Sequence, residues 1–314
     1  MRTYLAAAGL LCLLSSNIAA WADASIPEDV FGLMATEPCW LPRASLIAAN
    51  VDHENNLRIL PIVGAGGVQG LHDLANLRSV DAAILSSDSL VYAARQNLLD
   101  AQDEKFSYIA KIGTLKLVLI AKNDIKNITA LAGKRIATGP AQSAAFASGE
   151  LIFNALQIPF TRVAKQGESA IEALQSSKAD AALILGTEIS TASLSNGDFH
   201  ILALPLPPQL SEIYQPAMLN AQDLAGLNGK NEAVETLSSA LVLALFDRPR
   251  DAAHVQALKN FEKLMFTFSQ DESADNLAAN VLGWKRHITA QQILNQARNS
   301  NADTAQIIPT GAEP

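Results

Sequence analysis

Between residues 62 and 94, the spacing of hydrophobic positions predicts the order strand, helix, strand, helix. A short apolar strand ends at Val63 and leads into the glycine turn of residues 64–67, and the helix after this turn spaces its leucines three residues apart. The continuous apolar run of residues 82–85 is too short for a helix and predicts a strand that is buried on both faces. This order of elements predicts right-handed crossovers and a parallel sheet.

The two predicted helices begin directly after strands, so their free N–H groups lie at one edge of the sheet. Ser86, Ser87 and Asp88 provide N-cap residues before the second helix, which we expect at residues 90–99. Small anions bind at such helix ends because the free N–H groups and the helix dipole both favour negative charge. This edge is therefore a candidate site for a small polar or anionic solute.

The same order of elements returns later in the chain. A helix opens at residues 167–169, residues 180–185 repeat the earlier strand of residues 81–85, and residues 186–188 open the next helix. A glycine, a helix, the tripeptide Asp-Ala-Ala and a helix cap occur in the same order both times. We interpret the two copies as related α/β lobes that face each other.

Two long apolar segments, Phe106–Lys122 and Leu237–Phe246, flank the second copy and predict strands. Strands of this length can carry the chain from one lobe into the other and back. We therefore predict a first lobe from residues 25–120 and 236–300 and a second lobe from residues 121–235. We expect residues 301–314 to form a disordered tail.

The composition and the first residues bear on the compartment and the partner. The chain has 314 residues, of which 49% are hydrophobic, so it can bury an ample core. Its formal net charge of −8 argues against a nucleic-acid partner. An apolar stretch at residues 5–14 and the small residues Ala22 and Ala24 predict a cleaved signal peptide, residues 1–24, with Ala20 as an alternative cleavage site. We therefore expect a periplasmic protein.

The sequence offers little that indicates an enzyme. Without the signal peptide, Cys39 is the only thiol, so no intrachain disulfide can form. The five histidines have no metal-ligand spacing, the glycine turn lacks the dinucleotide-binding pattern, and no Gly-x-Ser-x-Gly motif is present. We expect no catalytic residue, no cofactor and no metal. An enzyme that uses Cys39 is a weaker alternative, because no histidine lies near this residue in sequence.

Several segments together resemble the TAXI family, the solute-binding subunits of TRAP transporters. The resemblance is carried by the signal peptide, the glycine turn, residues 81–88, the segment LAGKRIATGP at residues 131–140, and residues 180–186. It implies an α/β, type II periplasmic binding-protein fold with two lobes, each a mainly parallel sheet flanked by helices. It also implies a monomer that delivers a small carboxylate or amino-acid-like solute to the integral membrane subunits of a TRAP-type transporter.

In such proteins the ligand lies between the lobes, held by helix N-termini and by the loop after the first strand. The candidate ligand-binding residues all lie at such strand-to-helix junctions: Glu37, Trp40, Gly66, Gly67, Ser86, Ser87, Asp88, Gln142, Ser143, Gly186 and Thr187. Helix capping alone would also account for the serines and Asp88. Packing on the lobe surface would also account for Trp40.

The loop after the first strand departs from the family pattern. The family usually has glycine, a small residue and tyrosines there, whereas this chain has Glu-Pro-Cys-Trp-Leu at residues 37–41. An acidic side chain would repel a simple carboxylate by about 1 kcal/mol at 4 Å in water and by about 4 kcal/mol at an effective dielectric of 20. We therefore expect a solute whose amine contacts Glu37, with a Glu37 side chain that points to solvent as the alternative. A ligand-sensing or scaffold protein that acts on a membrane receptor remains the alternative function.

Overall fold

The computed structural model describes residues 29–51, 57–163, 170–186, 198–220, 233–267 and 277–305. The predicted signal peptide and Thr187 lie outside these residues. The first half of the chain contains, in order, β1 (Asp29–Ala35), η1 (Pro38–Trp40), α1 (Leu41–Val51), β2 (Leu57–Val63), α2 (Gly67–Asn76), β3 (Ala82–Ser86), α3 (Ser87–Arg95) and β4 (Phe106–Lys122). Later elements include β5 (Arg135–Ala137), α4 (Ala144–Ala155), β6 (Thr161–Val163), α5 (Ala170–Gln175), β7 (Ala181–Gly186), β8 (Phe199–Leu202), β9 (Gln215–Leu219), β10 (Val234–Phe246), α6 (Ala252–Thr267) and α8 (Ile288–Ala305).

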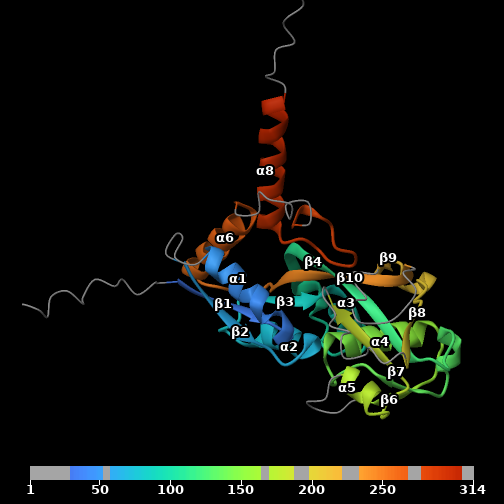
Figure 1. The fold of residues 1–314 in the computed structure, drawn as a ribbon. Coiled ribbons are helices and arrows are strands. Elements are labelled where there is room, and N and C mark those ends of the chain that lie inside the picture. The colour runs from blue at the N-terminus through green and yellow to red at the C-terminus, as the bar shows by residue number, and fades with distance from the viewer. Residues whose placement is uncertain are drawn as a thin grey trace, which may run out of the picture.

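The described strands form one sheet with the order β2-β1-β3-β10-β4-β7-β5-β6, while β8 pairs with β4 and β9 with β10. Parallel pairs form at both ends of this order, between β1 and its neighbours β2 and β3 and between β5 and its neighbours β6 and β7. Strands β10 and β4 are antiparallel to each other and to the adjoining strands β3 and β7. The predicted α/β fold, with parallel strands in each half and helices against them, is confirmed (Figure 1).

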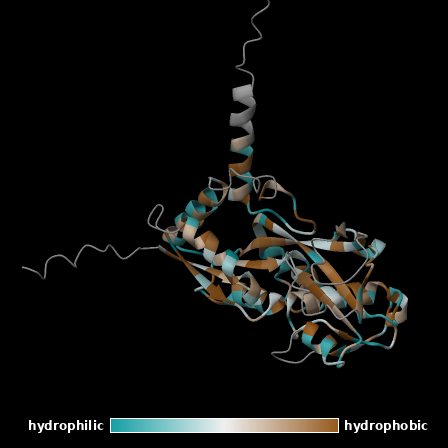
Figure 2. Ribbon diagram, viewed as in Figure 1, coloured by the Kyte–Doolittle hydropathy of each residue, from teal (hydrophilic) through white to brown (hydrophobic). Residues whose placement is uncertain are grey.

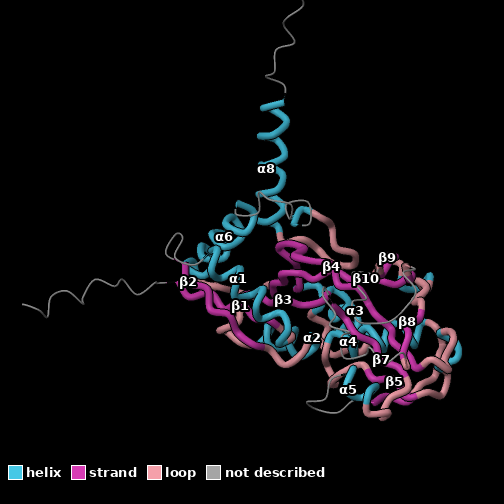
Figure 3. Tube along the Cα trace, in the orientation of Figure 1, coloured by secondary structure: helices cyan, strands magenta, loops and turns pink. Residues whose placement is uncertain are grey.

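The sheet has two halves, one with the parallel strands β1, β2 and β3 and one with the parallel strands β5, β6 and β7. The long strands β4 and β10 lie between them and together pair with both halves. The first part of β4 pairs with β10, whereas its last residues lie between β7 and β8. Strand β10 begins beside β9 and ends between β3 and β4. The side-by-side course of the two strands through the centre is visible in Figures 1 and 3. The exact lobe boundaries stay a prediction, but these strands connect the two halves as expected of the long apolar runs.

The core follows from the hydrophobic pattern. All five residues of β3 are buried, in agreement with the predicted strand between two covered faces. Figure 2 shows hydrophobic colour along the central strands and mixed colour on the outer helices. Leu71 and Leu74 of α2 are fully buried, but Leu77 is 46% exposed. The predicted leucine stripe is wrong at Leu77 because α2 ends at Asn76, one residue earlier.

Two helices differ in their bounds from the sequence predictions, and two strands were not predicted. Helix α3 begins at Ser87 and ends at Arg95, so the predicted helix at residues 90–99 was placed too late. Helix α8 continues to Ala305, so the first residues of the predicted disordered tail are helical. Figure 3 shows this helix projecting away from the sheet. Strands β6 and β9 were not predicted at all, because they are short and most of their residues are not buried.

Candidate functional site

The side chain of Glu37 lies between the N-termini of two helices, α2 and α4, that belong to different predicted lobes. Its Oε1 atom accepts hydrogen bonds from the backbone N–H of Gly67, at 3.2 Å, and of Ala144, at 2.7 Å. These are the first residues of α2 and α4, so both N–H groups are ones that the helices themselves leave free. These two helix ends therefore bind a carboxylate of the chain itself.

This geometry bears on the predicted role of Glu37. One carboxylate oxygen, Oε1, accepts hydrogen bonds from two backbone N–H groups, which the sequence did not predict, and the contact with a solute amine stays a prediction. The Glu37 side chain does not point only to solvent, since Oε1 accepts from the N–H groups of Gly67 and Ala144. Burial raises the pKa of Glu37, and these two hydrogen bonds oppose that shift. Sequence reasoning placed the residue correctly after the first strand but could not identify its partners, since they are backbone atoms.

The glycine turn before α2 is in direct contact with the loop before α4. The N–H of Val68 donates to the backbone oxygen of Gln142 at 3.1 Å. A Cβ atom on Gly66, whose φ is +120°, would lie 2.7 Å from that same oxygen, and one on Gly67 would lie 2.4 Å from Ser89 Oγ. Only glycine therefore fits at residue 66, whereas a Cβ at residue 67 would require Ser89 to shift. Gln142 contributes its backbone carbonyl to this contact, and its side chain is exposed.

Ser143 acts as the N-cap of α4. Its Oγ accepts a hydrogen bond from the N–H of Phe146 at 3.2 Å, which is the usual N-cap geometry. Ser143 is buried. It lies beside the Glu37 carboxylate, since the next residue, Ala144, donates its N–H to Glu37 Oε1. Helix capping thus accounts for the Ser143 side chain in this structure.

Asp88 is a fully buried carboxylate that accepts hydrogen bonds from three hydroxyl groups. Ser86 Oγ donates to its Oδ1 at 2.6 Å. Its Oδ2 accepts from Tyr214 at 2.6 Å and from Ser148 at 2.5 Å. Burial, and then the negative charge of Asp88, raises the pKa of Tyr214 well above its usual value. Ser148 belongs to α4 and Tyr214 precedes β9, so this buried network also joins the two halves.

Sequence reasoning missed Ser148 and Tyr214. A signal for Ser148 was available, since it is a polar residue in an otherwise apolar stretch of α4. Tyr214 lies beyond a proline-rich segment and carries no motif. Ser89 was also missed, and its Oγ lies 3.0 Å from that of Ser86.

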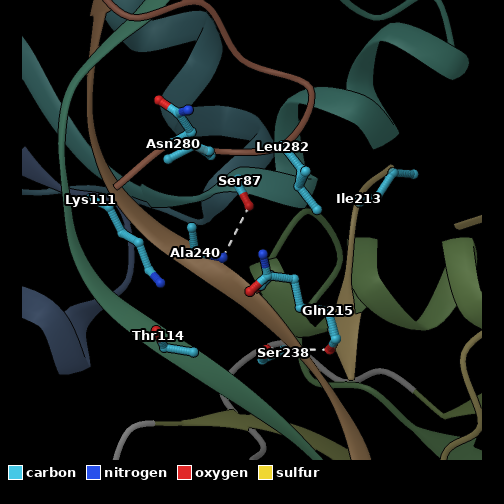
Figure 4. Close-up of a pocket in the computed structure, with 11 residues that line it drawn as sticks. Ser87, Lys111, Thr114, Ile213, Gln215, Ser238, Ala240, Asn280 and Leu282 are labelled. Atoms are coloured by element: carbon cyan, nitrogen blue, oxygen red, sulfur yellow. Dashed lines mark hydrogen bonds between the residues drawn. The ribbon is translucent and has the colours of Figure 1, made fainter. Parts of the chain in front are cut away.

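Ser87 does not join the Asp88 network but contacts β10, one of the two long strands. Its Oγ accepts a hydrogen bond from the N–H of Ala240 at 3.1 Å, and its carbonyl accepts one from Trp284 Nε1 at 2.8 Å. It lines a cavity of about 20 Å³ together with the side chains in Figure 4, among them Lys111 of β4 and Ser238 of β10. Burial lowers the pKa of Lys111. A volume of this size holds about one water molecule, so this cavity alone is too small for an amino-acid-sized solute.

A larger cavity, of about 280 Å³, lies between α3 and α4. Its lining is mixed and includes the cation of Arg95, the carboxylate of Glu150, and Tyr92, Asn154 and Gln209. None of the predicted site residues lines it. Helix α3 belongs to the predicted first lobe and α4 to the predicted second lobe. This cavity therefore lies at the contact between the two predicted lobes, as the Glu37 and Asp88 clusters do.

The remaining predicted residues lie apart from these clusters. Trp40 is 9% exposed and packs in the main hydrophobic core, which agrees with the packing alternative. Gly186 is the last residue of β7 and pairs with Lys116. The predicted residues brought together by the structure are thus Glu37, Gly66, Gly67, Gln142 and Ser143 in one cluster, with Ser86 and Asp88 in the next.

The described residues hold neither a cluster of metal ligands nor a helix that could span a membrane. These residues contain no group of three or more histidine, cysteine, aspartate or glutamate side chains placed to hold a metal ion. Within the same ranges, no helix combines the length and the apolar character that a membrane span requires.

The mixed α/β fold, with parallel strands on both sides of the antiparallel strands β4 and β10, matches the type II periplasmic binding-protein fold. The NMT1-like family matches residues 38–196. The chain belongs to the NMT1-like family. A comparison with curated proteins finds no match.

Solved structures of similar fold come from several bacteria. XAC2383 from Xanthomonas citri bound to ATP is 11% identical, with a TM-score of 0.49, and the match covers 90% of this chain and 100% of that chain. A TctC solute-binding protein from Polaromonas is 16% identical, with a TM-score of 0.47 and coverage of 88% and 96%. AbpA, an amino acid ABC transporter substrate-binding protein from Streptococcus pneumoniae bound to L-arginine, is 14% identical, with a TM-score of 0.44 and coverage of 78% and 93%. Similarity at this level carries no information about the ligand of this chain.

Proposed function

We propose that this chain is an exported solute-binding protein that captures a small carboxylate or amino-acid-like solute for the membrane subunits of a TRAP-type transporter. The observation that supports the carboxylate is the position between α2 and α4. There the N–H groups of Gly67 and Ala144 already bind one carboxylate oxygen, that of Glu37. Donors fixed at two helix ends favour an anion through both their hydrogen bonds and the helix dipoles.

Capture of a solute at this position requires the halves to separate and close again. Among the described residues, β4 and β10 are strands that pair in both halves, so bending within them would move one half relative to the other. Hinge closure around a ligand is a common form of domain motion. We propose that the protein is monomeric and acts in the periplasm, after removal of residues 1–24.

A second candidate function is ligand sensing or scaffolding at a membrane receptor. The specific observation in its favour is that side chains of the two halves satisfy one another directly. Asp88 is fully buried, and hydroxyl groups of the other half bind one of its oxygens. A protein that no longer binds a solute would keep these hydrogen bonds between the two predicted lobes at all times.

The test is a thermal-shift screen of the mature chain against carboxylates and amino acids, followed by calorimetry on any compound that binds. A compound at about 100 times its dissociation constant raises the free energy of unfolding by about 2.7 kcal/mol. Binding, together with uptake that depends on TRAP-type membrane subunits, would support transport. Binding without such uptake would favour sensing. No binding by any compound would count against transport and sensing and would favour the scaffold.

A further inference from the structure

The Glu37 carboxylate has the position and the partners of a bound anion. It lies where the first residues of α2 and α4 present their N–H groups, and a single oxygen accepts from both. These donors belong to segments that are far apart in the sequence, at residues 67 and 144. A carboxylate held in this way connects the two predicted lobes.

The backbone of Glu37 is relaxed, and its side chain has no local role. The residue is the N-cap of η1, but its side chain makes no capping hydrogen bond there. Its φ of −111° and ψ of 138° are ordinary extended values. The described hydrogen bonds of the side chain therefore go to the two helix ends and not to its own loop.

We propose that Glu37 is an internal occupant of the carboxylate position, so that a solute carboxylate binds there only when the Glu37 side chain withdraws. This inference rests on the proposed function, because it concerns the regulation of the same site. The closed arrangement of the two halves is then the state that the chain adopts with its own carboxylate in place of the solute.

The proposal has a consequence for selectivity. A tethered carboxylate competes at an effective concentration that is on the order of millimolar for a short flexible connection. A simple carboxylate such as acetate has only the same two hydrogen bonds to offer, so it displaces Glu37 poorly. A solute that carries further groups, such as an amine or a second carboxylate, can gain contacts elsewhere and overcome this competition. Glu37 thus selects for larger solutes.

Acetate provides a direct test, because it matches the end of the side chain that Glu37→Ala removes. The thermal stabilities of the wild type, of Glu37→Ala and of Glu104→Ala are compared in acetate and in chloride at equal ionic strength. Glu104 is an exposed glutamate in a 3₁₀ turn and serves as the matched control. We expect acetate to stabilise Glu37→Ala, with an apparent Kd at least about tenfold lower than for the wild type, because no internal competitor remains. The control variant should respond as the wild type does.

A second variant protects the test from misfolding. Glu37→Gln keeps the size and one acceptor oxygen but lacks the charge, so it should bind succinate and L-glutamate more tightly than the wild type does. Equal responses to acetate by the wild type and both alanine variants would overturn the proposal, and so would a Glu37→Gln variant without any gain.

The outcome for the proposed function is separate. A solute that binds the wild type and Glu37→Ala with equal affinity would refute the internal occupant and leave solute binding in place. Acetate binding by Glu37→Ala, with no larger solute bound by either protein, would support the internal occupant and refute solute binding.

Discussion

Removing the hydroxyl group of Tyr214 tests whether the buried Asp88 network holds the two halves together. Tyr214 is 1% exposed, and its hydroxyl donates to Asp88 Oδ2 at 2.6 Å. A hydrogen bond to a charged acceptor contributes about 1.5–3 kcal/mol. Tyr214→Phe deletes only the oxygen and leaves the hydroxyl groups of Ser86 and Ser148 on the carboxylate. We expect the free energy of unfolding to fall by about 2 kcal/mol.

Urea unfolding of the mature chain measures this loss, and Tyr92→Phe is a matched control. Tyr92 is 9% exposed, and its hydroxyl has no hydrogen-bond partner among the described residues. Its replacement should change the free energy of unfolding by less than about 0.5 kcal/mol. In an Asp88→Asn background, Tyr214→Phe should cost clearly less than in the wild type, because the charged acceptor is gone.

If Tyr214→Phe and Tyr92→Phe have equal effects, the bond to Asp88 contributes nothing to stability. If the cost of Tyr214→Phe is the same with and without Asp88, the loss comes from packing around the ring and not from the carboxylate.

Three further predictions concern other contacts. Gly66→Ala should lower the free energy of unfolding by about 3 kcal/mol or more, since its Cβ would lie 2.7 Å from a backbone oxygen at a φ of +120°; urea unfolding with wild-type stability would contradict this contact. Hydrogen bonds from Arg135 hold the pKa of Asp180 well below its usual value. The ionised Asp180 carboxylate should therefore stabilise the folded state at neutral pH, and this contribution should be lost as pH falls through the folded-state pKa. An unchanged acid-unfolding profile in Asp180→Asn would argue against it. Burial, and then the charge of Glu37, raises the pKa of Cys39, so Glu37→Gln should shift the pH profile of thiol labelling to lower pH, and an unshifted profile would exclude this coupling.

The sequence predicted the elements whose signals are local and continuous. Strand β4 has the predicted bounds, Phe106–Lys122, because its apolar run is long and ends at polar residues on both sides. Helix α4 begins where Ser143 predicts an N-cap. Strand β9, in contrast, has mostly exposed residues and a proline, and it exists because β10 offers an edge for pairing. Such pairing depends on distant residues and leaves no local pattern.

The site was predicted less well than the fold because its main donors are backbone atoms. The sequence placed Glu37, Gly66 and Gly67 at the junctions of strands and helices, and these residues do meet. It could not show that an N–H of Ala144 comes within 2.7 Å of the Glu37 carboxylate, since any residue type can provide that donor. The sequence therefore did not predict that Glu37 itself takes the place of an anion at two helix ends.

The two carboxylates at the contact between the predicted lobes, that of the fully buried Asp88 and that of the half-buried Glu37, differ in what could replace them. Asp88 accepts on both oxygens from hydroxyl groups of three different segments, so a free solute would have to reproduce three separate directions at once. Glu37 presents one oxygen to two N–H groups that are fixed by their helices, and any carboxylate of suitable reach can accept from them. Asp88 is therefore suited to hold the closed form, whereas the Glu37 position is the one that a solute can exchange into.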